Sequence, residues 1–135
     1  MELLGGMTYR FNEENTRRTL DPVVVERLRS LQRPGHPPVL ARLIDMYLEA
    51  APDLIGQIVT AVYYGDSEAL KDAAHLLKSK SVNLGVEAVA DVARELESFA
   101  RGVTEVDTQE LMSDLQREYE RAVGELVRER PFTEA

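Results

Sequence analysis

Apolar residues recur every three or four positions along most of this chain, and that spacing predicts α-helices. Runs of alternating apolar and polar residues, which would indicate strands, are missing. The helical segments cover residues 22–31, 38–64, 67–84, 86–101 and 107–128. The pattern therefore predicts an all-α fold, an up-and-down four-helix bundle with a short extra N-terminal helix.

Capping residues separate these segments. Asp21 before Pro22 is typical of a helix start, and Asp66 and Asp107 are further N-caps, Asp107 with an acidic residue three positions later. Gly65 and Gly85 are expected to end the second and third segments. Because the connection after Gly65 is very short, the helices on either side of it should be antiparallel neighbours. Pro52 should kink the second helix rather than split it, since the apolar stripe continues in phase across the proline.

A chain of 135 residues has the length of one domain. Residues 1–19 lack a sustained apolar period and contain paired glycines, so we expect a flexible N-terminal leader. Residues 20–130 should form the bundle domain.

The third helical segment carries a histidine on its polar side. At about 100° per residue, one side of this helix forms a buried stripe of Leu70, Ala73, Ala74, Leu77, Ser81 and Leu84. His75 lies about 140° from that stripe, so its imidazole should face water. Lys71 and Lys78 lie near His75 on the same wheel, whereas Lys80 points about 140° away from it.

Composition excludes several classes of function. The net charge of −8 disfavours binding to nucleic acid phosphates and to anionic membranes. The chain has no cysteine, which removes disulfides and thiolate metal sites. It also has no apolar run of membrane-spanning length and no signal peptide, so we expect a cytoplasmic protein.

The segment from Ala74 to Gly85, AHLLKSKSVNLG, resembles the signature A-H-x-L-K-[GS]-x-[AS]-x-x-[LMI]-G of histidine phosphotransfer (HPt) domains. The match runs over twelve consecutive positions, and the predicted bundle also suits this family. Many members have glycine four residues after the histidine, where this chain has Ser79.

The resemblance implies a phosphorelay intermediate. Such a protein accepts a phosphoryl group on its histidine, here His75, from the aspartate of a receiver domain and passes it to another receiver. Expected partners are response-regulator receiver domains and a hybrid histidine kinase, and the protein itself is expected to be a monomer. No cofactor or metal is expected, because the receiver brings the metal ion. The chain has no glycine-rich phosphate loop, so we expect no ATP-dependent kinase activity of its own.

Neighbouring side chains have expected roles at this histidine. A neutral imidazole offers one nitrogen lone pair as a nucleophile. Lys78, one turn further along the helix, should balance the charge of a phosphoryl group on His75, with Lys71 assisting. Lys71, Leu76, Ser79 and Val82 should belong to a partner-binding patch around the histidine.

Other readings stay open at this point. The bundle could be an adaptor that binds signalling proteins without phosphotransfer. A metalloenzyme is disfavoured, because Asp72 and His75 have the spacing of a ligand pair but point outward, and the other histidine, His36, lies in a proline-rich turn. No G-x-S-x-G elbow supports a hydrolase.

Overall fold

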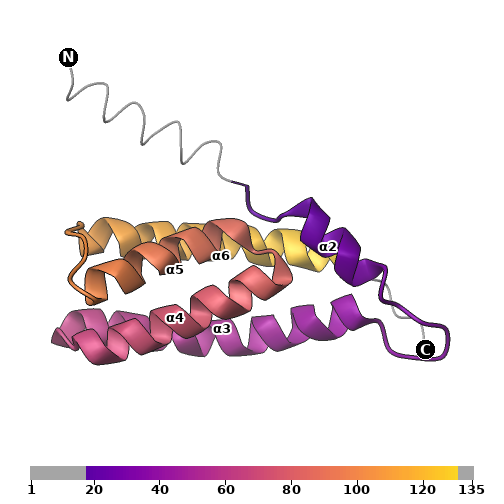
Figure 1. Cartoon of the computed structure of the whole chain (residues 1–135), viewed down its shortest axis with the longest axis horizontal. Coiled ribbons are helices and arrows are strands. Elements are labelled where there is room, and N and C mark those ends of the chain that lie inside the picture. The colour runs from indigo at the N-terminus through magenta and orange to yellow at the C-terminus, as the bar shows by residue number, and fades with distance from the viewer. Residues whose placement is uncertain (1–17, 131–135) are drawn as a thin grey trace, which may run out of the picture.

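The computed structural model describes residues 18–130, and its regular elements in that range are helices (Figure 1). They are α2 (Pro22–Arg29), α3 (Val39–Tyr64), α4 (Ser67–Leu84), α5 (Glu87–Ala100) and α6 (Thr108–Glu129). The prediction of an all-α bundle with an extra N-terminal helix is confirmed. Residues 1–17 of the expected leader lie outside the described residues.

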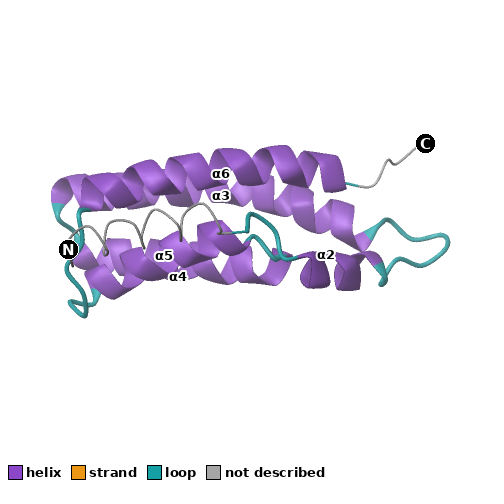
Figure 2. Cartoon of the chain, turned by 90° about the horizontal axis from the view of Figure 1, so that it is seen from above, coloured by secondary structure: helices purple, strands orange, loops and turns teal. Residues whose placement is uncertain are grey.

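The four long helices stand at the corners of a square. Helices α5 and α6 form one layer over α3 and α4, and the backbone of each helix lies close to those of its two neighbours (Figures 1 and 2). Helix α2 lies at the end of the bundle where α3 begins (Figure 1). None of the described helices combines the length and hydrophobicity that crossing a bilayer requires.

The predicted helix ends agree with the structure. The carboxylates of Asp21, Asp66 and Asp107 accept hydrogen bonds from backbone amides in the first turns of α2, α4 and α6. Gly65 ends α3 and Gly85 ends α4, each with a positive φ, at 68° and 77°. Helix α3 continues through Pro52 as a single element, so the prediction that it would not split there is confirmed.

The core follows the predicted stripes. All six residues of the α4 stripe are buried, including Ser81, whose hydroxyl lies 2.8 Å from the hydroxyl of the buried Tyr47. Helix α4 packs most extensively against α5, where small residues such as Ala74 and Ala93 are fully buried and let the two backbones approach. The helix that carries His75 is therefore held closely against α5.

The stripes did not predict which charged residues are buried. Asp114 and Glu118 on α6 are 3% and 0% exposed, and Glu97 on α5 is 5% exposed. Arginines lie beside the first two, with the Arg117 guanidinium 2.9 Å from Asp114 and the Arg121 guanidinium 3.6 Å from Glu118. Glu97 lies beside His75, and its surroundings are described below.

Residues 18–21 lie across the α4–α5 junction. The Asp21 amide donates a hydrogen bond to the Gly85 carbonyl (2.8 Å), and the Glu87 amide donates to the Thr19 carbonyl (3.0 Å). The chain before α2 is therefore hydrogen-bonded both to Gly85, the C-cap residue of α4, and to Glu87, the first residue of α5.

Candidate functional site

His75 lies midway along α4 on the outer side of the bundle. Its side chain is 56% exposed, as the helical wheel predicts. The ring does not stand free, however, because its Nδ1 atom is 2.9 Å from Oε2 of Glu97 on α5. Among the described residues, Nε2 has no hydrogen-bond partner, so this nitrogen is the one left for a reaction.

Glu97 is the centre of a polar cluster. Its side chain is 7% exposed, and besides His75 it contacts the Lys78 ammonium (2.7 Å, to Oε1) and the Arg101 guanidinium (2.9 Å, to Oε2). Burial alone would raise the pKa of Glu97, but the hydrogen bonds from Lys78, Arg101 and His75 outweigh it and lower the pKa from 4.5 to about 2. Glu97 is therefore an ionised carboxylate at neutral pH.

This carboxylate determines which imidazole nitrogen carries the proton. An ionised carboxylate only accepts hydrogen bonds, so a neutral His75 must place its proton on Nδ1 to make the 2.9 Å contact with Glu97. The lone pair is then on Nε2. The geometry thus holds the ring in one tautomer and one orientation, as carboxylates do for histidines in many active sites.

The charges of the cluster favour an anion beside His75. Lys78 and Arg101 are two cations that share the single negative charge of Glu97, which leaves one surplus positive charge when His75 is neutral. The Lys78 side chain is 25% exposed and that of Arg101 is 51% exposed, so both can reach an incoming group. An ammonium has three donors and a guanidinium has five, which leaves donors free for anion oxygens.

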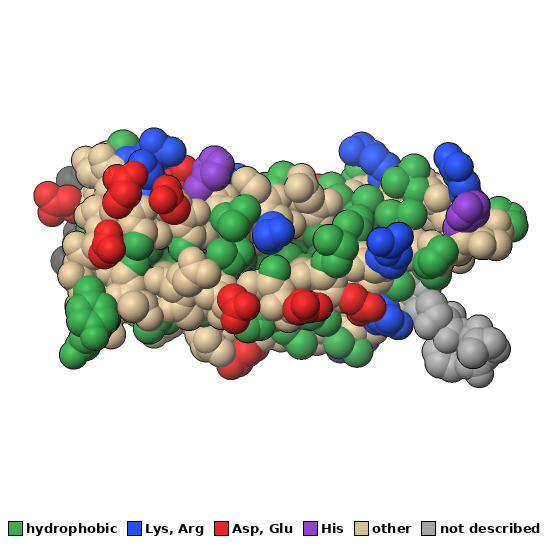
Figure 3. Space-filling view, turned by 90° about the horizontal axis from the view of Figure 1, so that it is seen from below, with side chains coloured by type: hydrophobic (Ala, Val, Ile, Leu, Met, Phe, Trp, Pro, Cys, Tyr) green, Lys and Arg blue, Asp and Glu red, His purple; other side chains and the backbone are tan. Residues whose placement is uncertain are grey.

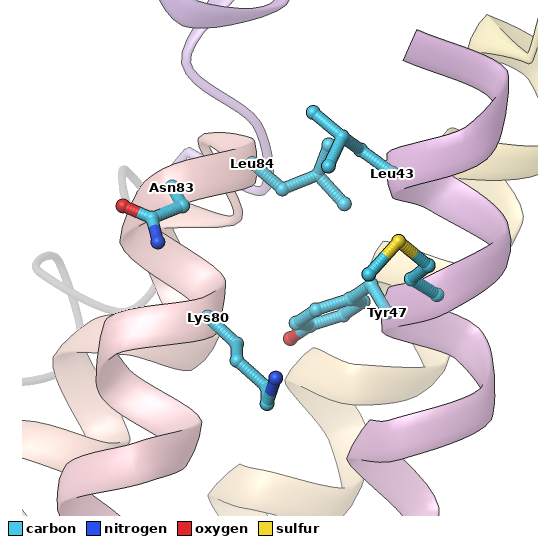
Figure 4. A pocket seen from close by; sticks show the side chains of 6 residues that line it. Leu43, Tyr47, Lys80, Asn83 and Leu84 are labelled. Carbon is cyan, nitrogen blue, oxygen red and sulfur yellow. The ribbon is translucent and has the colours of Figure 1, made fainter. Parts of the chain in front are cut away.

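The structure places the sequence-predicted residues as follows. Lys78 is next to His75 as expected, but its pairing with Glu97 was not predicted. Lys71 pairs with Glu68 one turn away on the same helix. Lys80 lies on the other flank of α4, where it lines a hollow between α3 and α4 (Figure 4).

The residues predicted to form a partner-binding patch are exposed or half-buried on α4. Leu76 and Val82 are 45% and 49% exposed, and Ser79 is half-buried between them. The small Ser79 side chain leaves room over the helix beside His75.

Sequence reasoning missed Glu97 and Arg101. Both belong to α5, and their signal is a glutamate in the apolar stripe between Leu96 and Ala100, followed by an arginine one turn later. A carboxylate at a core position requires cations nearby, and the wheel of α4 alone could not reveal them. Within residues 18–130, no group of three or more histidine and carboxylate side chains could hold a metal ion.

Comparisons with known proteins agree with this architecture. The Hpt domain family model matches residues 42–125. The crystal structure of histidine-containing phosphotransfer protein B (HptB) from Pseudomonas aeruginosa PAO1 is similar, with a TM-score of 0.73 and 25% sequence identity over 83% of this chain and 94% of that chain. Comparison with curated proteins gives no significant match. The family model spans more than half of the sequence and includes the helix that carries His75, so the chain belongs to the Hpt domain family.

Proposed function

We propose that this protein is a phosphorelay intermediate whose phosphoacceptor is His75. It takes a phosphoryl group from the aspartate of one receiver domain and gives it to the aspartate of another. The domain that does this spans residues 20–130.

The observation that carries the proposal is the contact between His75 and Glu97. An exposed imidazole whose Nδ1 is held by a buried carboxylate presents a fixed Nε2 lone pair to solvent. A structural surface histidine has no need of such an arrangement, which places a glutamate in the core.

The chemical step follows from this orientation. The Nε2 lone pair attacks phosphorus of the aspartyl phosphate, so that a P–N bond forms while the P–O bond to the aspartate breaks. The aspartate leaves as a carboxylate with the bonding electron pair. The ring keeps its Nδ1 proton and becomes positively charged, and Glu97 stabilises this charge through the 2.9 Å hydrogen bond. The second transfer reverses these events on another aspartate.

Lys78 and Arg101 are the groups that balance the phosphoryl charge. Phosphoryl transfer depends mainly on positioning and on neutralising the phosphoryl oxygens. Both cations are held within 3 Å of Glu97, on the carboxylate that also holds the ring. Lys71, which pairs with Glu68, lies one turn before His75 and adds positive charge from a greater distance.

The expected partners are receiver domains and a hybrid histidine kinase, and the protein acts as a cytoplasmic monomer. Leu76, Ser79 and Val82 are the apolar and small residues that contact the receiver around His75. The sequence contains no glycine-rich phosphate loop, so we expect no label when the protein is incubated with ATP alone.

The test is incubation with purified, phosphorylated receiver domains from the source organism, taken one at a time. We expect an acid-labile, alkali-stable label that disappears in His75→Gln. His36→Gln is the matched control, because it changes the only other histidine and should keep the label. Binding of a receiver without any label on His75 would refute phosphotransfer and favour the adaptor function.

A further inference from the structure

Three donors converge on the carboxylate of Glu97 from two helices. Nδ1 of His75 and the Arg101 guanidinium each lie 2.9 Å from Oε2, and the Lys78 ammonium lies 2.7 Å from Oε1. Because the three groups share one carboxylate, the guanidinium lies within about 6 Å of Nδ1 and the ammonium within about 8 Å of it. Contacts within the chain therefore fix two cations beside the imidazole.

A third basic side chain lies on the same flank of α4. The wheel places Lys71 about 40° and Lys78 about 60° from His75 in the same direction, toward α5. Glu68 raises the pKa of Lys71, and the positive charge of Arg101 opposes this shift, so the guanidinium and the Lys71 ammonium are neighbours. Basic groups thus line the side of the exposed ring that faces α5.

The carboxylates near His75 do not cancel this charge on the α5 side. Glu68 is paired with Lys71, and the cations around Glu97 outnumber it. Asp72 is exposed and makes no salt bridge with the described residues, but the wheel places it about 60° from His75 on the flank turned away from α5. An anion that approaches Nε2 is therefore attracted from the α5 side.

The donor in the proposed function is an acyl phosphate. In an aspartyl phosphate the phosphoryl group is bonded to a carboxylate oxygen, and every mixed anhydride of a carboxylic acid and phosphoric acid has the same bond. Phosphoryl transfer requires a positioned nucleophile and neutralised phosphoryl oxygens. Glu97 positions the nucleophile, and Lys78 and Arg101 supply the positive charge, so both requirements are met by this chain.

We propose that His75 also accepts a phosphoryl group directly from small acyl phosphates, without a receiver domain. The proposal rests on the proposed function, because it takes His75 as the phosphoacceptor. Nε2 attacks phosphorus, so that a P–N bond forms while the P–O bond to the acyl oxygen breaks. The small carboxylate leaves with the bonding electron pair, and the Nδ1 proton stays on the ring beside Glu97. The phosphoryl oxygens then face Lys78 and Arg101.

The second histidine provides a reference within the same molecule. His36 is exposed in the loop between α2 and α3 and shares a hollow with Arg33 and Arg42, but no described carboxylate contacts its ring. Figure 3 shows both histidines (purple) at the surface in separate places, each with basic side chains nearby. The rate at His36 therefore reports an imidazole that has cations nearby but no carboxylate to hold it in one tautomer.

The experiment is incubation of the full-length protein with acetyl phosphate, without added divalent metal. Mass spectrometry of peptides prepared at alkaline pH, where phosphohistidine is stable, locates the label. We expect His75 to be labelled at least about tenfold faster than His36, because a hydrogen bond to a charged group is made only at His75. Since His75 stands on an open helix face, its rate should rise in proportion to the acetyl phosphate concentration.

Variants of the cluster separate its contributions. Glu97→Gln should slow the labelling of His75 about tenfold or more, and Lys78→Ala and Arg101→Ala should each slow it about fivefold. Asp72→Asn should speed it about two- to fivefold at low ionic strength, because it removes a negative charge that repels the donor.

Lys80→Ala is the matched control for the loss of a lysine, because Lys80 lies on the other flank of α4. It should leave the rate at His75 unchanged. Labelling of His75 no faster than that of His36, or equal rates in Lys78→Ala and Lys80→Ala, would overturn the proposal.

Receiver domains distinguish the direct reaction from the proposed function. Label from acetyl phosphate that no purified receiver of the source organism removes would support the direct reaction and refute the phosphorelay. Label from phosphorylated receivers, with none from acetyl phosphate, would support the phosphorelay and refute the direct reaction. Circular dichroism confirms that the variants are folded.

Discussion

The Nδ1 atom of His75 lies 2.9 Å from Oε2 of Glu97, although the two residues are 22 positions apart and belong to different helices. Replacing Glu97 by Gln keeps a hydrogen-bond acceptor but removes the negative charge that stabilises the phosphorylated ring. A hydrogen bond to a charged group contributes about 1.5–3 kcal/mol, so Glu97→Gln should slow transfer to His75 about 10- to 100-fold.

Single-turnover transfer from a phosphorylated receiver measures this effect. Asp91→Asn is the control, because it alters an exposed carboxylate of α5 that pairs with Arg94 and leaves the cluster intact. A wild-type rate in Glu97→Gln would mean that the carboxylate only fills space.

Lys78→Ala and Arg101→Ala should have similar effects. The two cations share one carboxylate, so removing either one removes the surplus positive charge of the cluster. We expect each variant to slow transfer or to shorten the phosphohistidine lifetime about fivefold, because a partly exposed charge contributes about 1 kcal/mol. The double variant should lower the rate or the lifetime further.

The lifetime is measured by the loss of label from purified, phosphorylated protein. Lys80→Ala is the control, because Lys80 lies on the α3 flank of the helix. If Lys78→Ala left both the rate and the lifetime unchanged, its proposed role would be wrong.

The low pKa of Glu97 makes part of the stability dependent on pH. In the folded protein this pKa is about 2, against 4.5 for an ordinary glutamate, so the ionised form is favoured by folding. The resulting stabilisation is fully present above pH 4.5 and is lost as the pH falls toward 2. Compared with Glu97→Gln, the wild type should be about 1–3 kcal/mol more stable at pH 7, and this advantage should shrink through that window.

Urea unfolding of both proteins at several pH values between 7 and 2.5 tests this dependence. Glu49→Gln serves as the control, since Glu49 is exposed and makes no ion pair with the described residues. A difference between wild type and Glu97→Gln that is constant over the whole range would contradict the linkage.

Gly85→Ala should destabilise the fold by about 1–3 kcal/mol or more. The φ of Gly85 is 77°, and a Cβ there would lie 2.9 Å from Cβ of Val24 and 3.3 Å from the Asp21 carbonyl oxygen. Gly65→Ala is a matched control, because its φ of 68° gives similar backbone strain but no atom lies within 4 Å of the added Cβ.

Thermal unfolding of the two variants separates collision from strain. Gly85→Ala should unfold at a lower temperature than Gly65→Ala. Adding Val24→Ala, which removes the Val24 Cγ1 atom 3.1 Å from the added Cβ but keeps the Val24 Cβ, should recover part of the difference. Equal losses in the two variants would mean that the close approach of α2 has no energetic effect.

The sequence alone predicted most of the fold, because helix ends and buried stripes are local properties. The caps at Asp66 and Gly85 and the burial of Ser81 follow from neighbours a few positions away. The same wheel placed His75 on the surface beside Lys78. It could not reveal that Lys78 binds Glu97, because that contact depends on how α5 crosses α4.

Glu97 also shows why sequence reasoning described the site incompletely. A helical wheel places the residue among buried positions, but which cations surround it depends on the angle between two helices.

The hydrogen bonds of Thr19 and Asp21 at the α4–α5 junction have a consequence for the imidazole. Helix α4 carries His75 and α5 carries Glu97, so the junction is the pivot about which their separation is set. Glu97 lies ten residues beyond Glu87, about 15 Å along α5, and a small tilt at the pivot becomes a larger displacement at the carboxylate. Deletion of residues 1–21 would remove these two hydrogen bonds while leaving every residue of the polar cluster in the chain, and we expect it to change the distance between Nδ1 of His75 and Oε2 of Glu97.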